Sequence, residues 1–129
     1  MKSYKVVKFG QPLQKVEAAN PQPAGTEVLL RITAAGVCHS DVHLWEGFFD
    51  MGGGNKYSTA KTMNPPRTMG HEIVGEVVAV GPASKGTKVG DKAVVYPWIG
   101  CGKCAVCKAG QENHCVSGTR YLGGNRAGA

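Results

Sequence analysis

The chain has 129 residues, 42% of them hydrophobic, and a formal net charge of +6. This length suits one ordinary hydrophobic core, so we expect a single domain covering residues 1–129. No apolar run approaches the roughly 20 residues of a membrane span, and the N-terminal residues lack the apolar segment of a signal peptide. We therefore expect a cytoplasmic protein with reduced thiols and no membrane partner. Its lysines are spread along the chain, which argues against a nucleic-acid partner.

The first third of the sequence predicts short strands. Residues 4–9 and 13–18 are separated by a Gly-Gln-Pro turn. Residues 27–35 alternate between apolar and mixed side chains, which predicts a strand with one apolar face. The 19 glycines and 7 prolines divide the chain into many short segments. Together these features predict a mainly β fold, a barrel or sandwich with little helix.

The middle of the chain predicts one short helix and two further strands. Residues 40–46 are expected to form a helix that Ser40 caps and Gly47 ends. Residues 48–66 show no periodicity, which predicts a long functional or mobile loop. Valine-rich residues 70–80 and residues 89–96 each predict a strand.

Four of the five cysteines lie within residues 100–116, at Cys101, Cys104, Cys107 and Cys115. Two-residue gaps between the first three predict a tight loop that turns its thiolates onto one zinc ion. Four thiolates fill a tetrahedral zinc ion and leave no position for water or substrate, so this lobe is expected to be structural. Two disulfides are the alternative, but closely spaced cysteines on a loop are poorly placed for disulfide geometry.

The fifth cysteine belongs to a second candidate site. Cys38 follows a predicted strand, and His71 and Glu72 open another, so both segments are expected at loops that converge. A thiolate and an imidazole bind zinc well, and an open fourth position would make such an ion catalytic. Taken singly, Cys38 could equally be a buried thiol and His71 a hydrogen-bonded structural histidine.

These motifs together resemble the zinc-dependent medium-chain alcohol dehydrogenases. The matching segments are Gly-Val-Cys-His-Ser-Asp at 36–41, Gly-His-Glu at 70–72, Val-Gly-Asp at 89–91 and the four-cysteine lobe. They occur in the family's order and span nearly the whole chain. The resemblance implies that family's N-terminal catalytic domain, a partly open GroES-like β-barrel with short helices and a zinc-binding lobe.

The resemblance also implies roles for the second site. Cys38 and His71 would be two of three protein ligands of a catalytic zinc, and Glu72 would be a nearby acid able to approach the metal. Asp41 would accept the far N–H of His71, although it could also serve only the dipole of the short helix. Because neighbouring strand residues point to opposite faces, coordination by Glu72 is expected to need a bend in the strand.

Further roles follow from the same resemblance. Ser40 would accept the proton of the alcohol and His43 would pass it toward solvent. His39 stands where many members carry an arginine that contacts the cofactor pyrophosphate, so it would bind the cofactor. The alternatives are a helix cap for Ser40 and an ordinary surface position for His43. Trp45 and Phe48 are expected to line either the substrate pocket or the core.

Two family features are expected to lie outside this chain. They are the Rossmann domain that binds NAD or NADP, and the third ligand of the catalytic zinc. Residues 118–123 only superficially resemble a Gly-x-Gly-x-x-Gly motif, and residues 123–129 correspond to a run that leads into another strand in the family. We therefore expect a fragment with a full zinc lobe, a partly occupied second zinc site, and no cofactor binding or activity of its own.

The resemblance implies a parent enzyme that transfers hydride between a small alcohol and NAD(P), giving an aldehyde or ketone. Such an enzyme would require the missing Rossmann domain as a partner, and members of the family are commonly homo-oligomers. The alternative is a stand-alone zinc-binding module without enzymatic activity.

Overall fold

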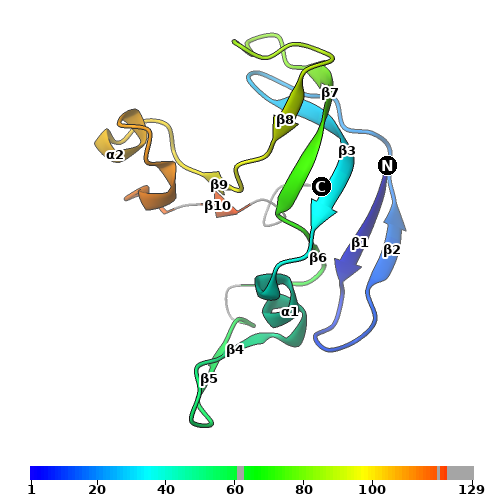
Figure 1. Cartoon of the computed structure of the whole chain (residues 1–129), viewed down its shortest axis with the longest axis vertical. Helices are drawn as coiled ribbons and strands as arrows, with labels where there is room; N and C mark the ends of the chain where they lie inside the picture. The colour runs from blue at the N-terminus through cyan, green and yellow to red at the C-terminus, as the bar shows by residue number, and fades with distance from the viewer. Residues whose placement is uncertain (61–62, 119, 122–129) are drawn as a thin grey trace.

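The computed structural model describes residues 1–60, 63–118 and 120–121, and within them short strands dominate, as predicted (Figure 1). The run 123–129, which we expect to lead into a strand, and part of the segment 118–123 lie outside the described residues. The elements in chain order are β1 (Lys2–Val6), β2 (Gln14–Glu17), β3 (Val28–Gly36), α1 (His39–Glu46), β4 (Phe48–Asp50), β5 (Lys56–Ser58), β6 (Arg67–Thr68), β7 (Glu72–Val80), β8 (Lys92–Val94), β9 (Trp98–Ile99), α2 (Ala105–Lys108), the 3-10 helix η1 (Glu112–His114) and β10 (Arg120–Tyr121).

The longest strands form an antiparallel sheet in the order β3, β7, β8. The central strand β7 confirms the strand predicted from the valine-rich residues 70–80, and within it Ile73, Gly75 and Val77 are buried between more exposed neighbours. Strand β3 fits the prediction less well, since register shifts at Leu29/Leu30 and Ile32/Ala34 interrupt its pairing with β7. These irregularities interrupt the two-residue period, so β3 has no continuous buried face.

A second antiparallel sheet has the order β2, β1, β6, and it places the start of the chain beside β6. Within it β1 supplies Val6, a fully buried side chain. The described strands form separate sheets, joined by loops, and do not close into a complete barrel (Figure 1). This arrangement agrees with the expected partly open barrel.

Helix α1 begins one residue earlier than expected. Its N-cap is Cys38 rather than Ser40, so the prediction of a Ser40 cap is wrong. The Asp41 carboxylate accepts the Cys38 backbone N–H at 3.1 Å, which is half of a capping box. Gly47 ends the helix as predicted, with a left-handed φ of 86°.

The segment 48–66 is not simply the loop that the sequence predicts. Strands β4 and β5 form a hairpin that projects from the molecule beside α1 (Figure 1). Its turn carries Gly52, Gly53 and Gly54, all with positive φ. Short, largely exposed strands give no apolar alternation, so the hairpin has no periodic signal in the sequence.

The cysteine-rich segment forms a small lobe at the edge of the molecule. It contains α2 and η1 and connects to the remainder through the paired strands β9 and β10 (Figure 1). Within the described ranges, no helix has the length and apolar character that a membrane crossing requires.

Candidate metal centres

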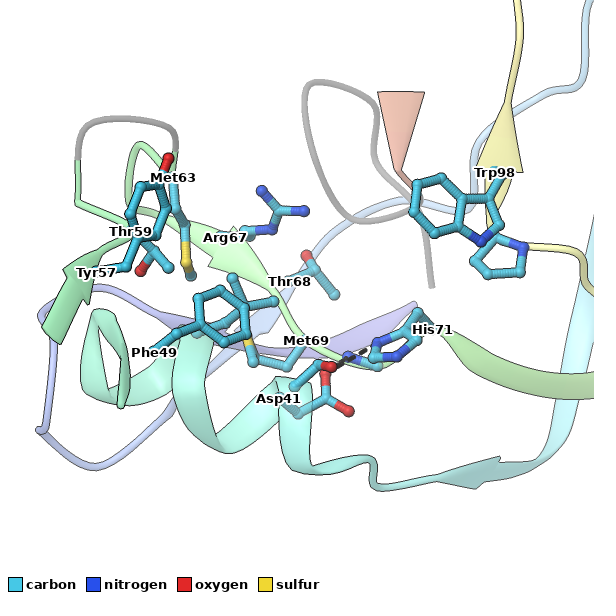
Figure 2. Close-up of a pocket in the computed structure, with 14 residues that line it drawn as sticks. Asp41, Phe49, Tyr57, Thr59, Met63, Arg67, Thr68, Met69, His71 and Trp98 are labelled. Atoms are coloured by element: carbon cyan, nitrogen blue, oxygen red, sulfur yellow. Dashed lines mark hydrogen bonds and ion pairs between the residues drawn. The ribbon is translucent and has the colours of Figure 1, made fainter. Parts of the chain in front are cut away.

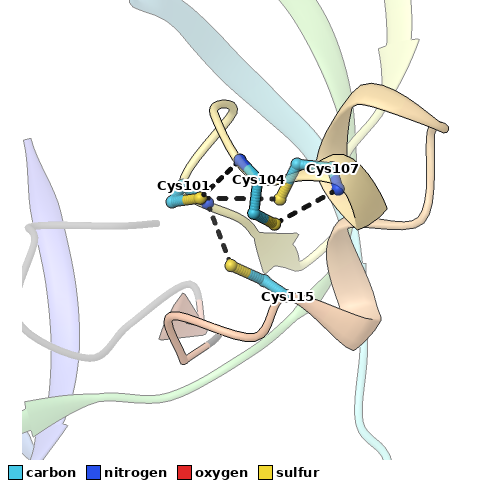
Figure 3. Close-up of side chains that lie close together, drawn as sticks. All are labelled: Cys101, Cys104, Cys107 and Cys115. Carbon is cyan, nitrogen blue, oxygen red and sulfur yellow. Dashed lines mark hydrogen bonds between the residues drawn. The ribbon is translucent and has the colours of Figure 1, made fainter.

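The four clustered cysteines converge on one point of the lobe (Figure 3). The Sγ atoms of Cys101, Cys104, Cys107 and Cys115 all lie within 4.8 Å of one another. Four sulfurs at about 2.3 Å from a zinc ion would be about 3.8 Å apart, and the Cys101 and Cys107 Sγ atoms are 3.9 Å apart. All four cysteines are free thiols, so the geometry fits a metal site and not a pair of disulfides.

Backbone amides surround these sulfurs. The N–H groups of Lys103 and Cys104 both donate to Cys101 Sγ at 3.4 Å. At the same distance, the Cys107 N–H donates to Cys104 Sγ and the Cys101 N–H donates to Cys115 Sγ. Such donors stabilise the thiolate form that a zinc ion requires.

The thiols of the lobe differ in acidity because their surroundings differ. The Lys103 and Cys104 N–H groups lower the pKa of Cys101 to about 6. The Cys107 N–H lowers the pKa of Cys104 as well. Burial raises the pKa of Cys107 to about 12, so this thiol would need the charge of a bound cation to ionise at neutral pH. The donor set therefore fits zinc.

A second cluster lies where α1 approaches β7. One ligand atom each from Cys38, His71 and Glu72 lies within 4.8 Å of the other two. Cys38 sits at the N-cap of α1, and His71 directly precedes β7. The backbone N–H and hydroxyl of Ser40, together with His71, lower the pKa of Cys38. Sulfur, imidazole and carboxylate donors suit a zinc ion with an open position.

The side chain of Asp41 contacts both segments that supply this cluster, the one at Cys38 and the one before β7. It is 8% exposed, and its Oδ2 accepts the N–H of Cys38 while its Oδ1 accepts the N–H of Gly70 at 3.2 Å. Oδ1 also lies 3.3 Å from Nδ1 of His71. Figure 2 marks this contact with a dashed line. With Nδ1 facing a carboxylate, Nε2 is the nitrogen of His71 that would be available to a metal ion.

Glu72 lies in the cluster, and the bend expected for its coordination falls just before β7 rather than within it. The chain already turns at Gly70, whose φ is +95°, and His71 lies before the first residue of β7. The Glu72 side chain crosses Gly36, its partner on β3, so closely that a Cβ there would meet Glu72 Oε2 at 2.2 Å. A larger residue at position 36 would therefore require the Glu72 carboxylate to move.

The residues expected to relay a proton lie on α1, but they do not form a connected chain. Ser40 Oγ lies 3.6 Å from Cys38 Sγ, and no hydrogen bond joins it to His43 in the described ranges. The ring centroid of His43 lies 4.5 Å from that of His39, on which it stacks, and 4.8 Å from that of Phe49. His43 is therefore half-buried and not an ordinary surface residue. His39 is exposed.

A cavity of about 480 Å³ adjoins the second cluster (Figure 2). Its aromatic lining consists of Phe49, Tyr57 and Trp98, whereas Trp45 and Phe48 are not part of the wall. No motif singles out these aromatic residues. The full lining is Ser40, Asp41, Leu44, Phe49, Tyr57, Thr59, Met63, Arg67, Thr68, Met69, Gly70, His71, Pro97 and Trp98.

The expected pocket residues have other partners. Trp45 donates its indole N–H to the Gln11 carbonyl at 2.7 Å. Phe48 packs under the Lys56 ammonium, 4.0 Å from its ring centroid. Both therefore support the helix and hairpin rather than the cavity.

Comparison with known proteins identifies this architecture. Residues 24–129 match the family model "Alcohol dehydrogenase GroES-like domain". The chain belongs to this family, which confirms the resemblance drawn from its motifs and the expected fold class.

Individual relatives are similar over nearly the whole chain. An NAD-dependent alcohol dehydrogenase of Saccharolobus solfataricus is 41% identical over 129 residues, which are 100% of this chain and 36% of that protein. An L-threonine 3-dehydrogenase of Pyrococcus furiosus is 39% identical over 115 residues, 89% of this chain and 30% of that protein. The crystal structure of the alcohol dehydrogenase from Aeropyrum pernix superposes with a TM-score of 0.81 and 30% identity, over 100% of this chain and 35% of that one. This chain thus spans about a third of each relative.

Proposed function

We propose that this chain is the catalytic domain of a zinc-dependent alcohol dehydrogenase, an oxidoreductase that uses a nicotinamide cofactor. The observation that carries the proposal is the convergence of Cys38, His71 and Glu72 beside a cavity large enough for a small substrate. Zinc bound by these residues would act as a Lewis acid toward the oxygen of an alcohol.

The residues around this cluster have roles that follow from their contacts. Asp41 fixes the tautomer and orientation of His71, and it ties the His71 segment to the N-terminus of α1. Ser40 lies beside Cys38 on the cavity wall, where its hydroxyl can accept the proton of the substrate alcohol. His43, one helical turn further, would pass the proton toward solvent after a small movement, and exposed His39 would contact the cofactor phosphates.

The cysteine lobe supports the proposal in a different way. Its four sulfurs would hold a structural zinc ion and leave no position for substrate. A stand-alone zinc-binding module would account for this lobe, but it gives no reason for the second cluster beside a cavity.

The cofactor site and the substrate belong to the whole enzyme. The relatives are about three times as long as this chain, and we propose that their additional part corresponds to a dinucleotide-binding domain. Because the relatives act on different alcohols, their names do not choose the substrate for this chain.

A chimera tests the proposal. This chain would replace the aligned segment of the Saccharolobus solfataricus enzyme, and NAD reduction would be measured with a panel of alcohols. We expect turnover that falls by roughly 100-fold or more in Cys38→Ser and His71→Ala, because each variant removes a zinc ligand. A folded, zinc-loaded chimera that binds NAD but oxidises no alcohol would contradict the proposal, as would full activity of Cys38→Ser.

A further inference from the structure

Two histidines of helix α1 lie outside both metal clusters. His39 and His43 are four residues apart, so they share one face of the helix, and their rings stack with centroids 4.5 Å apart. His39 is exposed, whereas His43 is half-buried. The helix therefore presents two imidazoles side by side, one of them open to solvent.

His43 is the more firmly held member of this pair. Its ring lies between those of His39 and Phe49, whose centroid is 4.8 Å away. Its Nδ1 is buried and has no hydrogen-bond partner among the described residues. The side chain is still 21% exposed, so solvent reaches other atoms of it. With Nδ1 covered, Nε2 is the nitrogen of His43 that would be available to a metal ion.

A carboxylate lies beside the buried nitrogen. Oε2 of Glu46, one helical turn further, is 3.7 Å from Nδ1 of His43. Histidines that bind metals commonly donate their other ring N–H to a carboxylate, and Asp41 faces Nδ1 of His71 in the same way. A shift of a few tenths of an ångström would make Glu46 such an acceptor, and its negative charge favours a cation near His43.

Two imidazoles on one helix face can bind one ion between them when they are four residues apart. Nitrogens that bind the same ion at about 2.0–2.1 Å lie at most about 4.2 Å from each other. The exposed side chain of His39 can rotate to reach this separation, because its ring already lies against that of His43. Imidazole ligands suit divalent ions such as Ni²⁺, Cu²⁺ and Zn²⁺.

We propose that His39 and His43 form a third metal site, which binds a divalent transition-metal ion such as Ni²⁺ or Cu²⁺. The site is inhibitory. In the proposed reaction His43 passes a proton toward solvent and His39 contacts the cofactor phosphates, and an ion between the two rings would occupy nitrogens that both tasks need. This inhibition rests on the proposed function, whereas the binding of the ion depends only on the two histidines.

Nickel binding to the chain tests the site without turnover. The ¹⁵N-labelled chain would be loaded with zinc, freed of excess metal and titrated with NiCl₂. Calorimetry measures the affinity, and the ring nitrogen resonances identify the ligands. We expect His39 and His43 to respond at a nickel concentration at least about tenfold below that for the exposed, unpaired ring of His114, because two linked ligands bind more tightly than one.

Four variants separate this site from the clusters described above. His39→Gln and His43→Gln should each weaken nickel binding by at least about tenfold, and His114→Gln should leave it unchanged. Cys38→Ser should also leave it unchanged, since it disables the second cluster but keeps a good N-cap residue for α1. If His43→Gln does not fold, His39→Gln decides the matter, because this side chain is exposed.

Equally tight nickel binding in His39→Gln and in the unmodified chain would overturn the proposal. Loss of the binding in Cys38→Ser would overturn it too, because the ion would then belong to the second cluster.

The chimera with the Saccharolobus solfataricus enzyme tests the inhibition. Nickel at ten times its dissociation constant should lower alcohol oxidation by about tenfold, and by no more than about twofold in a His39→Gln chimera, each relative to its own rate without nickel. Equal inhibition of both chimeras would contradict the inhibitory role. An inactive chimera, with nickel still bound at His39 and His43, would remove the proposed function and leave the metal site standing. An active chimera without nickel binding at this pair would do the reverse.

Discussion

Asp41 is the residue on which the second cluster depends most. A carboxylate that is almost fully buried is costly unless its charge is met by donors, and Asp41 meets two backbone N–H groups and the His71 ring. These contacts join α1 to the segment before β7, so one side chain sets the distance between Cys38 and His71.

Replacing Asp41 should therefore weaken metal binding at the second cluster, which is separate from the cysteine lobe. We expect Asp41→Ala to lower the affinity of the second site for zinc by about 10- to 100-fold, because His71 loses its orientation. Competition against a chelating dye measures this, and Asp50→Asn on the exposed hairpin is the control. Unchanged affinity in Asp41→Ala would show that His71 is held by other contacts.

Gly75 shows how closely the long strands approach each other. A Cβ at this position would lie 2.6 Å from the Arg31 carbonyl oxygen on β3, which is backbone and cannot rotate away. We expect Gly75→Ala to lower the free energy of unfolding by about 1–3 kcal/mol. Denaturant titration measures it, with Val94→Ala as the control, since that side chain is 81% exposed and its loss should cost less than about 0.5 kcal/mol.

If Gly75→Ala proved as stable as the control, the strands would have to separate without cost. That result would contradict the close approach of β3 and β7 in the sheet.

At the scale of elements, the sequence predicts long strands well and short ones poorly. Strand β7 was predictable because it is nine residues long and rich in valine, a β-branched residue that favours strands. The hairpin β4–β5 and the pair β9–β10 have strands of three or two residues, too short for periodicity to show. The cap of α1 was missed because a thiol rarely caps a helix, and the partner of Cys38 N–H is a side chain further along.

The cysteine lobe should behave as a separate element when its metal is lost. Its sulfurs are held by backbone donors from within the same segment, so zinc removal should unfold residues 100–116 and leave the β3–β7–β8 sheet intact. Cys104→Ser should show this pattern in amide hydrogen exchange, with lost protection in the lobe only.

Cys38→Ser is the matched control, since it alters the other cluster and should leave protection in the lobe unchanged. Global loss of protection in Cys104→Ser would mean that the lobe stabilises the whole fold. Retained protection would mean that the lobe needs no metal.

At the scale of the whole molecule, the motifs predict which residues meet, but not the surface that surrounds them. The family motifs predict that Cys38, His71 and Glu72 lie close together, and the structure places them in one cluster. The sequence does not predict that Phe49, Arg67 and Trp98 line one cavity, because no spacing or motif distinguishes them and they come from three separate elements. Substrate selectivity is thus the part of the site that needs the fold.

Anomalous scattering at the zinc edge, in crystals of this chain, measures whether zinc occupies the second cluster. We predict a strong peak among the four lobe sulfurs and a weaker one bonded to Cys38 Sγ and His71 Nε2, because a site with few ligands binds the ion less tightly. Full and equal peaks with only Cys38 and His71 as ligands would contradict the predicted partial occupancy. A full lobe with no peak beside Cys38 and His71, in crystals grown with excess zinc, would contradict the metal site itself and the function proposed from it.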